Sequence, residues 1–349
     1  MTAVENKMIR FAVGYQRPLT GESFCDIVED YREKISEVYF PWIGVATGRP
    51  VHGISDGMPD WEAQQVLEND LRRLAEDGVK LDLLLNGNCY GERAVSKGFE
   101  KEIVTLIEHL YVIGCKPDIV TTTSFFVART LKKYCSGIEV RASVNMRIGT
   151  IQAMSYASDY FDSFYMQRDL QRNIENVKRI RAWCTENNKR FGMLANSGCL
   201  RFCPAQVFHD NLLAHSAKVE EQNNVEDWNP HLCHNLYAKP ENYVYILQST
   251  WIRPEDLHLY DGLPDFVKLA TRQHSHPRMV LDAYSRGYYS GNLLDLLEPG
   301  FSYAFNPYYI SNSDFPDEWG ERMTECKNDC SLCSYCKSVL PDVLKKMSL

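Results

Sequence analysis

The fold is decided by residues 163–196, where Ser163-Phe-Tyr-Met-Gln-Arg168 precedes a helical segment and Arg190-Phe-Gly-Met-Leu-Ala-Asn196 follows it. Both outer runs are short and rich in apolar or aromatic residues, which is typical of buried strands. The segment between them, Leu170–Asn187, has apolar residues at helical spacing, at Ile174, Val177, Ile180 and Trp183. A strand, a helix and a second strand joined this closely predict a parallel βαβ unit.

The same alternation extends along the chain on both sides of this unit, with amphipathic segments such as Trp61–Glu76 between the strands. Eight runs are predicted as strands: Arg10–Tyr15, Glu37–Trp42, Lys80–Asn86, Asp118–Thr123, Ile138–Asn145, Ser163–Arg168, Arg190–Asn196 and Asp265–Ala270. Eight parallel strands close a barrel, so we predict an α/β fold of the (β/α)8 TIM type. The alternative is an open doubly wound sheet, which usually carries a glycine-rich phosphate turn after its first strand. Here the first strand runs into Gly14-Tyr15-Gln16-Arg17-Pro18, which has no such turn.

Two segments depart from the alternation. Residues 197–264 separate the seventh and eighth strands and carry Trp228 and Trp251, so we expect an ordered insertion in a barrel of residues 8–297. Long insertions at the carboxyl end of a barrel are usually functional. Residues 298–349 are predicted to form a cysteine-rich C-terminal tail.

Bulk properties limit the function classes. The net charge is -8, which argues against a broad phosphate-binding surface, so nucleic acid is not expected as a partner. Residues 1–10 lack the basic and apolar regions of an export signal, and no apolar run approaches the roughly 20 residues of a membrane span. We therefore expect a soluble cytoplasmic protein with no membrane association. In that compartment twelve cysteines are kept reduced, which favours metal binding over a disulfide framework.

Four cysteines lie within eleven residues of the tail, in Cys326-Lys-Asn-Asp-Cys330-Ser-Leu-Cys333-Ser-Tyr-Cys336. Thiolates at this spacing can converge on one 4Fe–4S cluster or on one tetrahedral zinc ion. The cluster is favoured because zinc sites more often pair two knuckles across a longer loop, and zinc is kept as the alternative. The first three cysteines also have the spacing found in radical S-adenosylmethionine enzymes. That motif follows the first barrel strand, however, whereas these cysteines follow the last.

A second cysteine group, Cys199, Cys203 and Cys233, begins where the seventh strand ends, which is where barrel loops build active sites. Gly198 would let the backbone approach a cofactor closely. We predict that these three cysteines bind a second cluster, the alternative being that Cys199 and Cys203 are ordinary buried residues. The spacing does not identify a fourth ligand, for which the candidates are Cys89, His231, His234, the substrate and a tail cysteine.

Polar residues at the predicted strand ends are candidates for substrate contact. A barrel brings them to one rim, where arginine and asparagine side chains can bind a carboxylate or an oxygenated ring. We take five of them as candidate catalytic residues: Arg168, Asp169, Asn196, Lys268 and Arg272. For each of them, capping of a loop is the alternative role. The chain has no Gly-x-Ser-x-Gly elbow, His-Glu-x-x-His pair or Walker loop, which disfavours the common hydrolase mechanisms.

The strand ends also resemble those of a known family. Arg168-Asp169-Leu170, then Phe191-Gly-Met-Leu-Ala-Asn196-Ser-Gly-Cys199, and finally Asp265-Phe-Val-Lys268-Leu-Ala-Thr-Arg272 are similar to the strand-end series of the collagenase-like peptidase family U32. In that family a strand ending in Arg-Glu leads through a helix to a glycine–cysteine turn, and the last strand carries a lysine followed four residues later by an arginine. The resemblance covers about residues 8–297 and is best over 163–297.

The resemblance implies an iron–sulfur barrel with a cluster near Cys199 and Cys203. Several family members act in oxygen-independent hydroxylation, of a ubiquinone precursor or of RNA bases, rather than in proteolysis. This chain departs from the family pattern in the gaps between Cys199, Cys203 and Cys233 and in its additional tail cysteines. The family's substrate is therefore not carried over to this chain.

Three functions follow from the sequence. The leading hypothesis is an iron–sulfur enzyme that catalyses an oxygen-independent redox modification, such as hydroxylation, of a small molecule, with one or two 4Fe–4S clusters. The second is a non-catalytic iron–sulfur subunit that delivers electrons to a protein redox partner. The third is a metal-dependent peptidase.

Overall fold

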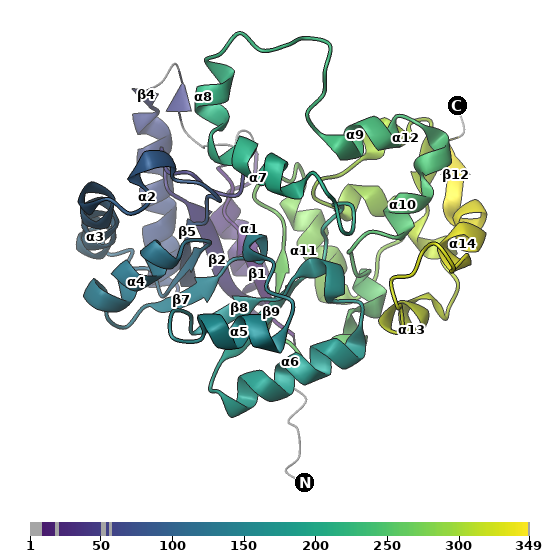
Figure 1. The fold of residues 1–349 in the computed structure, drawn as a ribbon, viewed down its shortest axis with the longest axis horizontal. Helices are drawn as coiled ribbons and strands as arrows, with labels where there is room; N and C mark the ends of the chain where they lie inside the picture. Colours follow the sequence, from purple (N-terminus) through teal and green to yellow (C-terminus); the bar gives the residue numbers. More distant parts are fainter. Residues whose placement is uncertain (1–8, 18–20, 50–53, 56–57, 348–349) are drawn as a thin grey trace.

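The computed structural model describes residues 9–17, 21–49, 54–55 and 58–347. Its centre is a closed barrel of eight strands in the order β1-β10-β9-β8-β7-β6-β5-β2, with every neighbouring pair parallel (Figure 1). The strands are β1 Phe11–Gly14, β2 Ile35–Pro41, β5 Lys80–Leu85, β6 Ile119–Thr122, β7 Glu139–Ala142, β8 Ser163–Tyr165, β9 Arg190–Leu194 and β10 Phe266–Leu269. Each one overlaps a strand predicted from the sequence, so the (β/α)8 fold is confirmed.

Helices cover the outside of the barrel. They are α1 Phe24–Asp30, α2 Trp61–Glu76, α3 Lys97–Val112, α4 Phe125–Tyr134, α5 Ile151–Ala157, α6 Ile174–Glu186 and α11 Pro277–Arg286. The first six all begin at a Ser, Thr, Asp or Asn whose side chain accepts a hydrogen bond from the first turn, and α11 begins with a proline. A short antiparallel pair, β3 Ile54–Ser55 and β4 Met58–Pro59, precedes α2.

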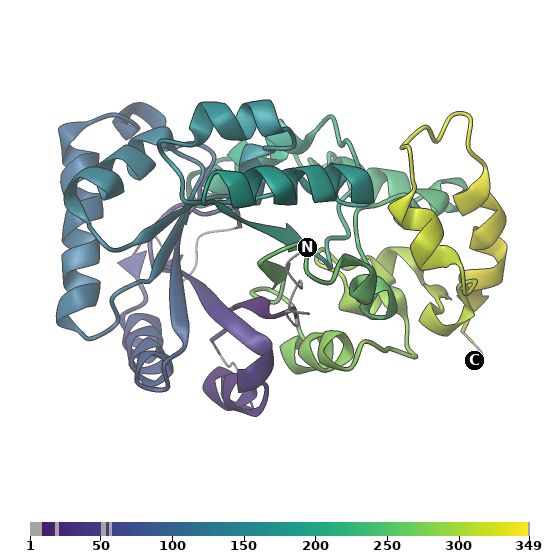
Figure 2. The same cartoon turned by 90° about the horizontal axis from the view of Figure 1, so that it is seen from below.

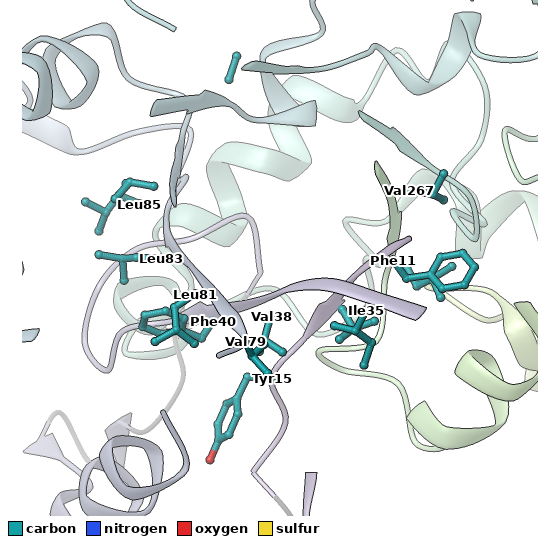
Figure 3. Close-up of a cluster of buried hydrophobic side chains, with 14 of the residues drawn as sticks. Phe11, Tyr15, Ile35, Val38, Phe40, Val79, Leu81, Leu83, Leu85 and Val267 are labelled. Carbon is teal, nitrogen blue, oxygen red and sulfur yellow. The ribbon is translucent and has the colours of Figure 1, made fainter. Parts of the chain in front are cut away.

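Alternate residues of each strand face opposite sides of the barrel wall. Phe11, Val38, Phe40, Leu81 and Leu83 point outward and pack with the helices in the main hydrophobic core (Figure 3). The inward residues include a small apolar set of Ala12, Tyr39, Leu84, Tyr165 and Phe266. The barrel is therefore filled by side chains, as expected for eight strands.

The interior also holds a buried ionic network. Arg141 pairs with both oxygens of Glu37, donates to Glu139 Oε1 at 2.8 Å and lies 3.7 Å from Asp82 Oδ2. Arg141, Glu37 and Asp82 are almost completely buried. Removing one partner would leave the others charged and unpaired, so this network constrains how the strands assemble.

The second half of the insertion and the tail form one lobe beside the barrel, on the side away from α2, α3 and α4 (Figures 1 and 2). Its elements are α9 Leu232–Tyr237, α10 Val244–Leu247, α12 Ser302–Phe305, β11 Tyr308–Ile310, α13 Trp319–Thr324, α14 Tyr335–Val343 and β12 Leu344–Lys346. The first two helices of the insertion, α7 Gln206–Ala214 and α8 Ser216–Glu220, lie outside this lobe, and residues at their junction line a cavity together with residues of α3. Trp251 of the insertion stacks on Trp319 of the tail, with ring centroids 5.8 Å apart, and Tyr243 stacks on Phe305 at 4.0 Å. The two segments therefore share a second hydrophobic core.

Within the described ranges, no helix has the length and apolar character needed to cross a membrane.

Candidate active site

The loops that follow the barrel strands meet at the carboxyl end of the barrel, which we call the mouth. Thr47, in the loop after β2, accepts a hydrogen bond from Arg272, which follows β10, at 3.1 Å. Arg49 forms an ion pair with Glu298. Helix α7 of the insertion crosses this region, and its Asp210 pairs with Arg147 at 3.1 Å. Residues from distant parts of the chain are thus fixed around one opening.

The loop from Ser197 to Cys203 carries the first two cysteines and is held in a specific shape. The Gly198 N–H donates to Glu298 O, and a Cβ at Gly198 would stand only 2.2 Å from Pro299 O, so only glycine fits here. Phe202 has a φ of 54° and its N–H donates to Asp169 Oδ1 at 2.7 Å. Gln167 donates to the other oxygen of Asp169 at 3.0 Å. Asp169 therefore anchors the cysteine loop to the end of β8.

Cys199, Cys203 and Cys233 lie close enough together to affect one another electrostatically. Burial raises the pKa of Cys233 to about 12, and Cys199 and Cys203 both add to the effect. Burial also raises the pKa of Cys203, with a further contribution from Cys199. The structure thus brings together the three cysteines that were grouped from the sequence.

Three histidines stand next to these thiols. The rings of His209 and His231 are 4.7 Å apart, and those of His231 and His234 are 5.1 Å apart. Burial lowers the pKa of His209 to about 4, and His231, Arg49 and Arg168 lower it further. A neutral imidazole is the form that binds a metal. His209 was not among the predicted ligands; the only available signal was its position six residues after Cys203.

The four tail cysteines form a separate group in the lobe. Burial raises the pKa of Cys336 to about 11, Arg172 opposes this, and the other three tail cysteines add to it. Cys330 and Cys333 are exposed. Arg201, which lies between Cys199 and Cys203 in the chain, reaches Cys326 Sγ at 3.6 Å and also donates to Asn328. The two cysteine groups are therefore neighbours, connected through the side chain of Arg201.

Across the described part of the chain, no three or more His, Cys, Asp or Glu side chains are placed to enclose a single metal ion.

Lys268 lies inside the barrel, below the mouth. Its Nζ is 3.6 Å from the centre of the Tyr39 ring and 5.2 Å from that of Tyr165. Burial lowers the pKa of Lys268 to about 8, an effect that Asp82 partly offsets and Arg272 reinforces. Burial likewise raises the pKa of Asp82 to about 7, against the influence of Arg141. Lys268 and Asp82 are therefore the groups of the barrel interior that can exchange protons near neutral pH.

Arg168 and Asn196 occupy different positions although both follow strands. Arg168 is buried and lies near Cys203, His209 and Asp210, whose pKa values it lowers. Asn196 is fully buried, and its amide donates to Ala270 O and Leu296 O and accepts from the Ala270 N–H. The Asn196 side chain thus connects the ends of β9 and β10.

Cys89 lies at a different place on the same face. It lines a cavity of about 510 Å³ between the loop after β2, helix α3 and the α7–α8 turn, together with Trp42, His215 and Lys218. Ala46 also lines this cavity and immediately precedes Thr47 of the mouth, so the two regions share one loop.

Comparison with known proteins gives a sequence relative and a structure with a similar fold. No family model matches it. It is 28% identical over 274 residues to the "Uncharacterized protease MJ1657" of Methanocaldococcus jannaschii, covering 76% of this chain and 78% of that protein. The structure is similar to that of the U32 peptidase Mk0906, with a TM-score of 0.52 and 15% identity, covering 75% of this chain and 92% of that one. The chain is thus similar in sequence to a protein named as an uncharacterized protease and shares its barrel fold with a U32 peptidase, in line with the resemblance of its strand ends to the U32 family.

Proposed function

We propose that this protein is an iron–sulfur enzyme that carries out an oxygen-independent redox modification, such as hydroxylation, of a small molecule bound at the barrel mouth. The observation that carries the proposal is the gathering of Cys199, Cys203 and Cys233 beside the buried guanidinium of Arg168. Soft thiol donors next to a polar opening at the carboxyl end of a barrel combine a redox cofactor with a substrate site.

The residues present fit a 4Fe–4S cluster. Cys199, Cys203 and Cys233 would hold it, and His209, His231, His234 or the substrate would take the fourth position. Each ligand of such a cluster binds a different iron, so the thiols need not enclose a single ion. Arg49 and Arg168 lie near Cys199 and Cys203 respectively and would offset the charge of the thiolates. When bound, the cluster supplies one-electron transfer.

The chain's own residues would bind and orient the substrate. Arg168 and Arg272 offer planar donors at the mouth, and α7 is joined to the mouth by the bond between its Asp210 and Arg147. Lys268 has a pKa near neutral and can hold or release a proton at Nζ, below the substrate. Asp169 keeps the cysteine loop in place through the Phe202 N–H.

A protein redox partner fits the same proposal. The tail thiols Cys330 and Cys333 are exposed, while Cys336 is part-buried and lies toward the interior of the lobe. A cluster or a zinc ion held by Cys326, Cys330, Cys333 and Cys336 would therefore lie at the surface. A protein partner could reach such a group at the surface, and Arg201 lies between these four cysteines and the mouth cysteines.

The test is anaerobic purification followed by chemical determination of iron, acid-labile sulfide and zinc, and by electron paramagnetic resonance of the dithionite-reduced protein. We expect iron and sulfide in similar amounts and a signal that appears on reduction. Protein that contains zinc but neither iron nor sulfide would overturn the proposal.

A peptidase is the second candidate, favoured by the names of the sequence relative and the structural neighbour, a protease and a peptidase. Incubating the same preparation with gelatin and with a mixed peptide library, and following new amino termini, separates the two functions. Hydrolysis that is abolished by a chelator and survives in a Cys199→Ser, Cys203→Ser double variant would favour the peptidase. We expect no hydrolysis above that of a buffer control.

A further inference from the structure

The mouth carries more positive than negative charge. Four guanidinium groups from four different strand ends, those of Arg49, Arg147, Arg168 and Arg272, surround it. Glu298 pairs with Arg49, and Asp210 pairs with Arg147. Among the residues that the structure describes, Arg168 and Arg272 have no carboxylate within ion-pair distance. Arg168 and Arg272 therefore lack a direct ion-pair partner in the described part of the chain, although Asp210 and Glu298 respectively lie near enough to affect them electrostatically.

Arg168 is the clearest of these unpaired groups. Its residue is only 8% exposed, and in the described ranges its guanidinium makes no hydrogen bond or ion pair. None of its nitrogen atoms is among the described buried atoms without a partner, in contrast to Nε of Arg147, so the group keeps some contact with solvent. A largely buried guanidinium without a hydrogen-bond partner lowers the stability of the folded protein, and a bound ligand that accepted its hydrogen bonds would remove that cost.

Other unsatisfied atoms lie in the same place. Nε of Arg147 and Oδ1 of Asn88 are buried without partners, although Arg147 and Asn88 both bond Asp210 through other atoms. Burial lowers the pKa of Arg272 to about 10, with a contribution from Arg49, which reflects the crowding of positive charge. The unpaired Asn88 oxygen is an acceptor and Arg147 Nε is sealed from solvent, so the donors available to an anion are those of Arg168 and Arg272.

Neutralising the cysteine thiolates is the competing role for these arginines. Arg49 lies near Cys199, and Arg168 lies near Cys203. The charged groups that affect Arg272 are instead Arg49, Tyr39 and Glu298, and no cysteine is among them. Arg272 is therefore the residue that separates the two roles.

We propose that the mouth binds an anionic oxygen group of the substrate, a carboxylate or a phosphate, at Arg168, with Arg272 adding positive charge through its neighbour Arg49. Planar guanidinium groups bind both kinds of group with paired hydrogen bonds. The inference rests on the proposed function in placing the substrate at this mouth. The binding itself, however, depends only on side chains of this chain and can be measured separately from the cluster.

The experiment titrates anaerobically prepared protein with malonate, benzoate or inorganic phosphate, and with malonamide and benzamide as uncharged counterparts, by isothermal calorimetry. We expect saturable binding of the anions, weakened by salt, and no comparable binding of the amides. The comparison of malonate and benzoate with phosphate shows which anion the mouth prefers. Arg272→Gln and Arg168→Gln should each weaken anion binding about tenfold or more. Arg286→Gln, on the outer face of α11, is the matched control and should bind as the wild type does.

Iron content and circular dichroism are measured on every variant, so that loss of the fold is recognised. Loss of anion affinity in Arg272→Gln with unchanged iron supports the inference. Equal binding of anions and amides, or variants that lose iron but keep the wild-type anion affinity, would overturn it. Wild-type protein that binds anions but contains no iron or sulfide leaves the inference standing and rejects the proposed function.

Discussion

Asp169 and Arg168 are adjacent in the chain, but the structure gives them opposite surroundings. The two oxygens of Asp169 accept hydrogen bonds from Phe202 and Gln167, while the Arg168 guanidinium stays unpaired at the mouth. Asn196, at the next strand end, uses its whole amide to join residues 270 and 296. Arg168 thus supplies a free group, while Asp169 at the same strand end and Asn196 at the next supply structural connections.

This difference could not be predicted from the sequence. The periodicity of the strands correctly placed Arg168, Asp169, Asn196 and Lys268 at or near the carboxyl end of the barrel. Whether each side chain is free depends on partners such as Phe202 and Ala270, which lie 33 and 74 residues away and are positioned only by the closed barrel. The roles proposed for these residues stay predictions.

Asp169→Asn tests the anchoring of the cysteine loop. Asparagine has only one acceptor oxygen, so either the Phe202 N–H or the Gln167 amide is left unpaired. An unpaired buried donor costs about 1–3 kcal/mol of stability. We expect the cysteine loop to become mobile while the barrel stays folded. Iron should then be lost faster to a chelator than from the wild type, and Asp261→Asn, at an exposed turn, is the control. An unchanged rate of iron loss would show that Asp169 does not hold the loop.

Lys268 gives a stability effect whose sign is fixed by its environment. Its pKa is about 8 in the folded protein and 10.5 ordinarily. Between these values the unfolded chain binds a proton that the folded chain does not, so the contribution of Lys268 to the free energy of unfolding increases with pH. We expect the free energy of unfolding of the wild type, relative to that of the Lys268→Met variant, to increase by roughly 1–3 kcal/mol between about pH 7 and about pH 9.5. Urea unfolding of both proteins at each pH measures the difference, and a flat or falling difference would be inconsistent with a lowered pKa.

At the scale of elements, helix α7 connects the insertion to the mouth. It places His209 near Arg168 and Asp210 beside Arg147, although no side chain caps its first turn. His209 was not among the ligands predicted from the sequence. The direction in which a helix of an insertion packs depends on contacts with the barrel loops, and these are not encoded in the local pattern.

Asp210→Asn tests the balance of charge that α7 brings to the mouth. The substitution removes the carboxylate that pairs with Arg147 and lies near Arg168. Because the mouth then gains one net positive charge, the removed repulsion between the Asp210 carboxylate and the anion should let malonate bind severalfold more tightly. Calorimetric titration against the wild type measures this. Weaker binding in the variant would mean that Asp210 orders the mouth rather than opposing the anion.

At the scale of the whole molecule, the lobe joins segments that look independent in the sequence. The barrel and its eight strands were predictable because each strand and helix carries its own hydrophobic period. The shared core of the lobe was not predictable, since Trp251 meets Trp319, and α10 packs with α14, across long stretches of chain. Such contacts leave no periodic signal.

Truncation after Glu325 should consequently damage the insertion as well as the tail. It removes Val339 and Val343, both buried in the shared core. Burial of each side chain contributes roughly 1.5–3 kcal/mol to the free energy of unfolding. We expect the truncated protein to bind a hydrophobic dye and to expose residues 232–251 to hydrogen exchange. Replacing Cys326, Cys330, Cys333 and Cys336 by serine leaves that core in place. This variant should neither bind the dye nor show increased hydrogen exchange in residues 232–251. A truncated protein with wild-type exchange in residues 232–251 would show that the lobe does not depend on the tail.

The central claim is that the mouth cysteines hold an iron–sulfur cluster of their own, next to the substrate site. The most direct test compares iron and sulfide per chain, prepared anaerobically, in the wild type, in the Cys199→Ser, Cys203→Ser, Cys233→Ser triple variant and in the serine variant of the four tail cysteines. We predict that the triple variant loses one cluster's share of iron and keeps its fold, and that the tail variant retains the mouth cluster and its electron paramagnetic resonance signal. A triple variant with the full iron and sulfide content of the wild type would contradict the account.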